Sequence, residues 1–193
     1  NVLASTGTTG TIMPCGWVFL ESGSNANTNY AVGDGSSNSG NTFSFGTAGS
    51  ADRALGGLLS SNLAPNYGAY FTNSTGSVVG TLLITYTGEQ WRSAGPVGRT
   101  DAITLQLSTD AASLGSGSWV TQTALAFIGN ANVVTTALDG NLAPNRRTIS
   151  GSISGLSIPT GSTFWIRWID FNAAGSDDGL AIDDFSLTAL AVV

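Results

Sequence analysis

The sequence has no histidine, no lysine and a single cysteine among its 193 residues. One cysteine excludes an internal disulfide and a zinc site made of thiolates. A catalytic cysteine would need a histidine partner, which the chain lacks. We therefore expect Cys15 to be a small buried apolar residue. Because the chain also has no nucleophile motif, we predict that it is not an enzyme.

Charged residues are also scarce, at 9% of the chain. The six basic residues are all arginine and the acidic residues number 12, which gives a net charge of −6. Nucleic-acid binding requires a basic stripe, and this sequence has none. The same shortage disfavours anionic membrane surfaces. An acidic chain with so little other charge is better suited to binding a cation.

No apolar run reaches the ~20 residues of a membrane-spanning helix, and no basic, apolar leader is present. The chain starts at Asn1, which we interpret as a processed mature form or an excised domain. A lysine-free sequence rich in Ser, Thr, Asn and Gly is typical of extracellular proteins, and we expect that location.

The residues that are abundant indicate β-structure. Aromatic and β-branched residues alternate with polar ones at period two, and Gly/Asn/Ser/Asp clusters separate these runs. No window keeps helical periodicity over three turns. The sequence predicts an all-β fold: one domain over residues 1–193, a two-sheet β-sandwich of jelly-roll type with about ten short strands. The clearest strand candidates are residues 16–21, 42–46, 67–73, 78–91, 103–107, 119–128, 146–158 and 164–171.

Residues 51–59 (ADRALGGLL) allow two interpretations. They could form one helical turn or a bulged strand. Glycine destabilises a helix interior, so the Gly56–Gly57 pair argues against the helix.

The stretch from Ser162 to Thr188 combines an aromatic strand, an acidic loop and a second strand, which predicts a central hairpin. Its first strand is apolar on both faces, as in a strand covered on both sides. Trp165 and Arg167 share one face and, with Trp91, are candidates for an aromatic surface that binds sugar rings. Core packing is the alternative, because large aromatic residues mostly serve cores.

The acidic half of this stretch predicts a structural Ca²⁺ site. Calcium takes six to eight oxygen ligands, many of them carboxylates on loops. Asp177, Asp178 and Asp183 supply carboxylates, and Glu21 could complete the set if the two ends of the chain are adjacent. The alternative is a solvated acidic turn in which Asp183 caps backbone donors or pairs with an arginine.

Glu89, in the segment GEQWR, raises one catalytic alternative. Glycoside hydrolysis needs two acidic side chains at a fixed separation. The simpler interpretation is that Glu89 pairs with Arg92 or Arg99, and it agrees with our prediction that the chain is not an enzyme.

Three segments resemble an extracellular β-sandwich domain of secreted bacterial multidomain proteins: GWVFLESGSNANTNYAVGDGSSNSGNTFSFG, ITYTGEQWR and FWIRWIDFNAAGSDDGLAIDDFSL. The resemblance spans nearly the whole chain and carries over no catalytic residues. The closing GLAIDDFSL is also similar to the last strand of jelly-roll adhesion and carbohydrate-binding modules. That resemblance implies that Asp183 serves a structural Ca²⁺.

The two ends of the chain suggest a function in assembly. Residues 1–10 are weakly strand-forming and residues 189–193 are apolar, and a sheet edge can accept an added strand. We therefore predict strand exchange at these ends and an extracellular subunit that forms a homo-oligomer, filament or surface layer. The alternative function is calcium-dependent glycan binding or adhesion.

Overall fold

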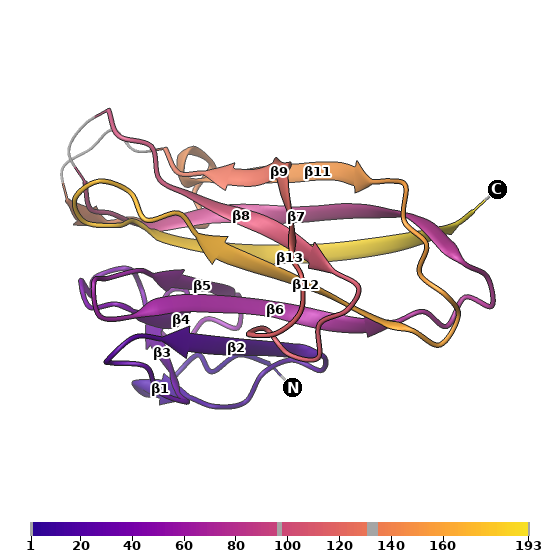
Figure 1. Cartoon of the computed structure of the whole chain (residues 1–193). Helices are drawn as coiled ribbons and strands as arrows, with labels where there is room; N and C mark the ends of the chain where they lie inside the picture. The colour runs from indigo at the N-terminus through magenta and orange to yellow at the C-terminus, as the bar shows by residue number, and fades with distance from the viewer. Residues whose placement is uncertain (1, 96–97, 131–134, 193) are drawn as a thin grey trace.

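Two β-sheets packed face to face make up the fold of this protein (Figure 1). The computed structural model describes residues 2–95, 98–130 and 135–192. One sheet has eight strands in the order β1-β3-β4-β5-β13-β7-β10, with β11 also paired to β7. These are β1 (Thr9–Gly10), β3 (Tyr30–Gly33), β4 (Asn41–Phe45), β5 (Ala54–Leu58), β13 (Gly179–Ala191), β7 (Val79–Ser93), β10 (Thr136–Ala137) and β11 (Arg146–Ile153).

The second sheet has five antiparallel strands, β2 (Trp17–Ser22), β6 (Ala64–Thr72), β12 (Thr163–Asp170), β8 (Ala102–Ser108) and β9 (Val120–Ile128), in that order. From β5 to β8, successive strands alternate between the two sheets, as jelly rolls do. The predicted fold class is confirmed. The strands exceed the predicted ten partly because β1 and β10 are two-residue pairings.

The alternating segments form strands where the sequence predicts them. The longest, β7, has 15 residues and begins one residue after the predicted start. The two alternatives for residues 51–59 resolve to the strand β5. A Cβ at Gly56 would lie 2.5 Å from that of Ala181 on β13, so glycine allows the two strands to pair closely.

The predicted hairpin of residues 162–188 is wrong. β12 is the central strand of the five-stranded sheet, between β6 and β8, whereas β13 lies in the opposite sheet between β5 and β7. The acidic loop therefore crosses from one sheet to the other. Packed sheets are ~10 Å apart, and the eight residues between the two strands are long enough to span that gap.

Trp168 on β12 lies at the centre of the core and is 0% exposed. Its ring stacks on Trp17, with ring centroids 5.9 Å apart, and on Tyr67 at 6.4 Å. Tyr86 and Phe185 from the opposite sheet meet the ring edge-on, at 5.3 and 5.7 Å. One side chain thus contacts aromatic residues of both sheets.

The two ends of the described chain pair within its own sheets. Leu3 is buried, and β1 pairs with β3. Ala189 to Ala191 pair with the beginning of β7. Strand exchange between subunits stays a prediction. Among the described residues, no helix has the length and apolar character needed to cross a bilayer.

The prediction for Cys15 is wrong, because its side chain is exposed. The turn before β2 places it outside the core: Trp17 N donates to Pro14 O at 3.0 Å, and Gly16 has a φ of +80°. The Cys15 side chain in that turn is accessible to solvent.

Candidate functional site

The acidic loop brings Asp177 next to two carboxylates from other parts of the chain. Asp101 precedes β8, and Asp170 ends β12. One carboxylate oxygen from each of these three residues lies within 4.8 Å of the other two. Burial raises the pKa of Asp101 to about 6 and that of Asp170 well above its usual value, and the neighbouring carboxylates add to both effects.

Asp178 lies beside this group but has its own partners. Its Oδ1 accepts from Arg99 Nη2 at 2.6 Å and from the backbone N of Ala94 at 2.8 Å, and its Oδ2 accepts from Gln90 Nε2 at 2.9 Å. Arg99 Nη1 also reaches Asp101 at 3.3 Å. Asp178 and Arg99 therefore form a buried ion pair, and the hydrogen bond from Gln90 holds the acidic loop against β7.

Glu21 and Asp183, the other two predicted calcium ligands, are not in this group. Glu21 is buried and ties a loop to β4: it accepts from Asn27 N at 3.0 Å and from Thr42 N at 2.8 Å. Asp183 is half-buried on β13 and accepts from Asp184 N at 2.8 Å. Burial raises the pKa of Asp183 to about 6.

The three predicted sugar-binding residues differ in exposure. Trp91 is 2% exposed and stacks on Phe45, so it belongs to the core. Trp165 is 9% exposed and lies 5.0 Å, between ring centroids, from the exposed Tyr70.

Arg167 is half-buried under the loop between β8 and β9. Its guanidinium lies 3.9 Å from the centroid of Trp119 and donates to Gln106 Oε1 at 2.8 Å and to Leu114 O. The side chain is engaged within its own fold.

Glu89 pairs with neither Arg92 nor Arg99, contrary to the interpretation from sequence. Its Oε2 accepts from the indole nitrogen of Trp91 at 2.9 Å. Arg92 instead donates to the carbonyl oxygens of Gly35 and Ser36, and Arg99 pairs with Asp101 and Asp178. Burial raises the pKa of Glu89 to about 7.

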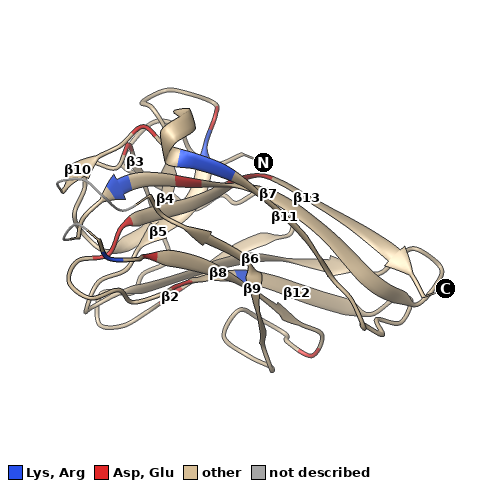
Figure 2. Ribbon diagram, turned by 90° about the horizontal axis from the view of Figure 1, so that it is seen from above, with Lys and Arg blue, Asp and Glu red and all other residues tan. Residues whose placement is uncertain are grey.

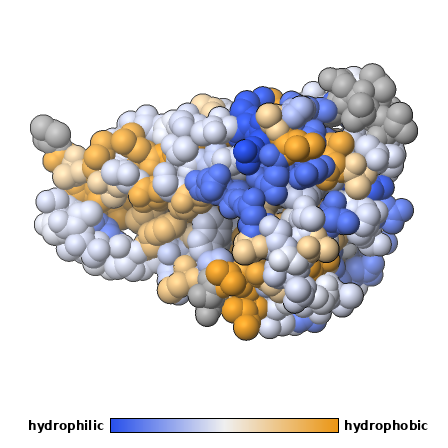
Figure 3. All heavy atoms as spheres, turned by 180° about the vertical axis from the view of Figure 1, so that it is seen from behind, coloured by the Kyte–Doolittle hydropathy of each residue, from blue (hydrophilic) through white to orange (hydrophobic). Residues whose placement is uncertain are grey.

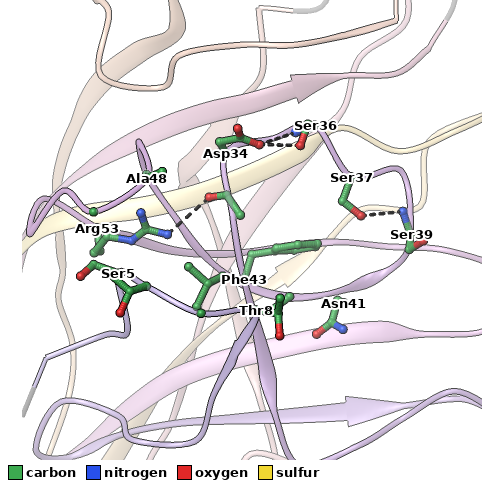
Figure 4. Close-up of a pocket in the computed structure, with 17 residues that line it drawn as sticks. Ser5, Thr8, Asp34, Ser36, Ser37, Ser39, Asn41, Phe43, Ala48 and Arg53 are labelled. Carbon is green, nitrogen blue, oxygen red and sulfur yellow. Dashed lines mark hydrogen bonds between the residues drawn. The ribbon is translucent and has the colours of Figure 1, made fainter.

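A polar pocket of about 590 Å³ lies at the edge of the eight-stranded sheet formed by β1, β3 and β4 (Figure 4). The sequence did not predict it. The N-terminal segment, the loop after β3 and the loop after β4 form its walls. These segments are rich in serine and threonine. The turn-forming residues 34–41 (DGSSNSGN) are the one local signal, but they reveal no cavity until the N-terminal segment packs across from them.

Arg53 and Asp34 are the charged residues of this pocket. Arg53 is buried, and its guanidinium donates to Ser44 Oγ at 3.0 Å and to Thr47 O at 3.1 Å, which holds the pocket wall together. Asp34 is exposed and accepts from the hydroxyl of Ser36 at 2.6 Å and from its backbone N at 3.1 Å. These bonds lower the pKa of Asp34, so it is ionised at neutral pH.

Asn41 and Phe43 of β4 also line the pocket. The Oδ1 atom of Asn41 is buried and has no hydrogen-bond partner among the described residues. Phe43 stacks on Phe45 with ring centroids 4.7 Å apart and gives the pocket an apolar wall. Hydroxyls, one carboxylate, one amide and one aromatic ring thus surround a single cavity.

No protein-family model matches the chain, and no curated protein matches it. Three solved structures have loosely similar folds. The enzymatically active domain of bacteriophage CBA120 tailspike protein 4 has a TM-score of 0.45 and 8% identity, over 91% of this chain and 20% of that one. TmCBM61, solved in complex with β-1,4-galactotriose, has a TM-score of 0.43 and 14% identity, over 91% and 90%. A structure titled "CBM4 structure and function" has a TM-score of 0.38 and 14% identity, over 91% and 95%.

Proposed function

We propose that this β-sandwich is an extracellular glycan-binding domain and that the polar pocket is its binding site. The observation that carries the proposal is the chemistry of the pocket lining. Its volume, about 590 Å³, falls within the roughly 300–1,000 Å³ of small-molecule sites. The extracellular location rests on composition, since the chain lacks lysine and is rich in Ser, Thr, Asn and Gly.

Sugar hydroxyls both donate and accept hydrogen bonds, and the lining offers groups of both kinds. The Asp34 carboxylate can accept from two neighbouring hydroxyls, and charge strengthens such bonds. Asn41 adds a side-chain amide to the pocket lining, and an amide both donates and accepts hydrogen bonds. Phe43 offers apolar surface for the C–H groups of a sugar ring.

Calorimetric titration with a panel of neutral oligosaccharides tests this proposal. We expect one class to bind the wild-type chain, and Asp34→Ala and Asn41→Ala each to weaken its binding at least tenfold. Asp34 is exposed, so its replacement removes ligand contacts and leaves the core intact.

Tyr70→Ala is the matched control, because Tyr70 is exposed on β6 of the other sheet. This variant should bind like the wild type. If it loses binding while Asp34→Ala keeps it, the site is the Tyr70–Trp165 surface and not the pocket. Absence of binding across the panel would contradict the proposed function itself.

Self-assembly is a second candidate function, and the open edge of β13 favours it. β13 pairs with β7 along its length but with β5 only through Leu180, Ala181 and Ile182. Beyond Ile182, no strand pairs with that side of β13 among the described residues. An open strand edge offers unpaired backbone donors and acceptors to a second chain.

Charge and hydropathy at this end also favour association. Residues 54–88, 148–166 and 185–193 contain no charged residue, and Figure 2 shows the charged residues gathered away from the C-terminal end. Figure 3 shows hydrophobic residues beside the C-terminus. Val78, Leu83, Leu190 and Val192 are each 41–58% exposed. Strand edges that stay unpaired in monomeric proteins usually carry charge, and the open edge of β13 carries none beyond Asp184.

Sedimentation across a concentration series, with electron micrographs, tests assembly. We expect the wild-type chain to associate and Thr188→Lys, which places a charge on the open edge, to shift it toward monomer. Ser24→Lys, in an exposed loop, is the control for the added charge and should associate like the wild type. A wild-type chain that stays monomeric at every concentration would contradict self-assembly.

A further inference from the structure

Asp170 is the most unusual acidic residue in the described chain. Both of its carboxylate oxygens are buried, and neither has a hydrogen-bond partner among the described residues. A buried charge without a partner destabilises the folded state by several kcal/mol, as an order of magnitude, because it has lost its hydration. Proteins reduce this cost by protonating the group or by placing a positive charge next to it.

The surroundings of Asp170 add negative charge. Oxygens of Asp101 and Asp177 lie within 4.8 Å of its own carboxylate and of each other. Among the described residues, Arg99 forms the ion pairs in this acidic region, and its partners are Asp101 and Asp178. No ion pair to Asp170 or Asp177 is formed by the described residues.

Coordination capacity remains on all three residues of the group. Asp177 accepts one hydrogen bond, from Ala173 N at 2.8 Å to Oδ1, which leaves its Oδ2 available. Asp101 Oδ1 accepts one bond, from Ala102 N at 2.8 Å, and an oxygen of this kind has two lone pairs. Asp170 has both oxygens available.

We infer that Asp101, Asp170 and Asp177 bind a divalent cation, with Ca²⁺ as the best-fitting ion. Three carboxylates supply hard oxygen ligands, which Ca²⁺ prefers, and water would complete its six to eight positions. Asp177 also lines a cavity of about 460 Å³ that opens beside Asn172 and Arg92. That cavity adjoins the group on the Asp177 side and is large enough to hold water.

The position of the group assigns the ion a structural role. The three ligands come from the start of β8, the end of β12 and the loop that crosses to β13. A cation bound to all three would hold the crossing loop to the five-stranded sheet. It would stabilise the folded chain without requiring any contact with a glycan.

The experiment uses the whole chain, treated with a chelator and then titrated with Ca²⁺ or with Tb³⁺ as a luminescent probe. Heat unfolding is followed with and without 5 mM Ca²⁺, as a ligand that binds only the folded state raises the midpoint. We expect Ca²⁺ to raise the melting midpoint of the wild type. Asp170→Asn and Asp177→Asn should each weaken Ca²⁺ binding at least tenfold and reduce that rise.

Two sets of variants make the result specific. Asp184 is an exposed acidic residue outside the group, so Asp184→Asn should keep the full rise of the midpoint with Ca²⁺. Glu21→Gln and Asp183→Asn should also keep it. If these two remove the response while Asp170→Asn and Asp177→Asn keep it, the ion binds elsewhere and the inference is overturned.

The inference also fails if Ca²⁺ and Tb³⁺ neither bind the wild-type chain nor raise its midpoint. Asp170 would then share a proton with Asp101. The Tb³⁺ titration needs only folded protein, so a variant that is unstable on heating can still be read at low temperature. Loss of Tb³⁺ affinity in folded Asp177→Asn, with affinity unchanged in Asp184→Asn, would support the site.

Discussion

The indole nitrogen of Trp91 donates a 2.9 Å hydrogen bond to Oε2 of Glu89, two residues earlier on β7, and both side chains are at most 2% exposed. Arg146 on β11 is paired opposite Glu89 in the sheet but forms no ion pair with it among the described residues. Burial outweighs the indole bond and raises the pKa of Glu89 to about 7. This carboxyl is therefore held in the folded chain mainly as the neutral acid at mildly acidic pH.

The raised pKa of Glu89 predicts a pH-dependent stability. Between pH 4.5, the usual pKa of a glutamate, and about pH 7, the folded state binds this proton and the unfolded state releases it. The contribution of Glu89 to stability is thus present below pH 4.5 and is lost as the pH rises through 7. Glu89→Gln mimics the neutral acid, so we expect its melting midpoint to exceed that of the wild type at pH 8 by about 5 °C.

Melting curves of the wild type and Glu89→Gln at pH 5 and pH 8 measure this effect. The difference between the two chains isolates Glu89 from the other buried acids, which also titrate in this range. Asp139→Asn, at an exposed site, is a charge-matched control and should show no such difference. A difference that is equal at both pH values would contradict the prediction.

Arg99 should be far more important to stability than its position in a loop suggests. Its guanidinium bonds to Asp101 and Asp178, and all three side chains are at most 7% exposed. Removing one partner of a buried ion pair leaves uncompensated charge and costs about 3–5 kcal/mol. We expect Arg99→Met to lower the free energy of unfolding by about that amount in urea titrations.

Arg147→Met is the control for Arg99. Arg147 is exposed and lies 5.6 Å from the centroid of the Phe127 ring, a contact worth roughly 0.5–1 kcal/mol. We expect a loss no larger than that. If the two variants lose equal free energy of unfolding, the Arg99 ion pair contributes no more to stability than the exposed Arg147 contact does.

Trp168 should be the most costly aromatic residue of β12 to truncate. It contacts aromatic residues from both sheets and is 0% exposed, so Trp168→Ala removes contacts and leaves a cavity. We expect a loss of about 3–5 kcal/mol in urea unfolding. Tyr70→Ala, which truncates a side chain that is 44% exposed, should cost less than about 1 kcal/mol. A Trp168→Ala chain as stable as Tyr70→Ala would contradict this account of the core.

The sequence by itself determines the fold class and most strands of this protein. Period-two alternation places inward side chains on one face of a strand, and this local signal predicts β7, β8 and the apolar β12. The two-sided apolar pattern of β12 also predicts its central position, which the sheet order confirms. A side-chain period depends only on neighbouring residues, so it is readable without tertiary contacts.

Tertiary structure alone decided which carboxylates meet and where a cavity forms. β12 and β13 are adjacent in sequence but lie in opposite sheets, because strand partners are chosen by packing across the sandwich. That arrangement places Asp177 next to Asp101 and Asp170, whereas Asp183 and Glu21 lie outside this group. The polar pocket likewise needs the N-terminal segment to pack beside the β3 and β4 loops. No spacing in the sequence encodes these contacts, because they join separate segments of the chain that come together in space only in the folded structure.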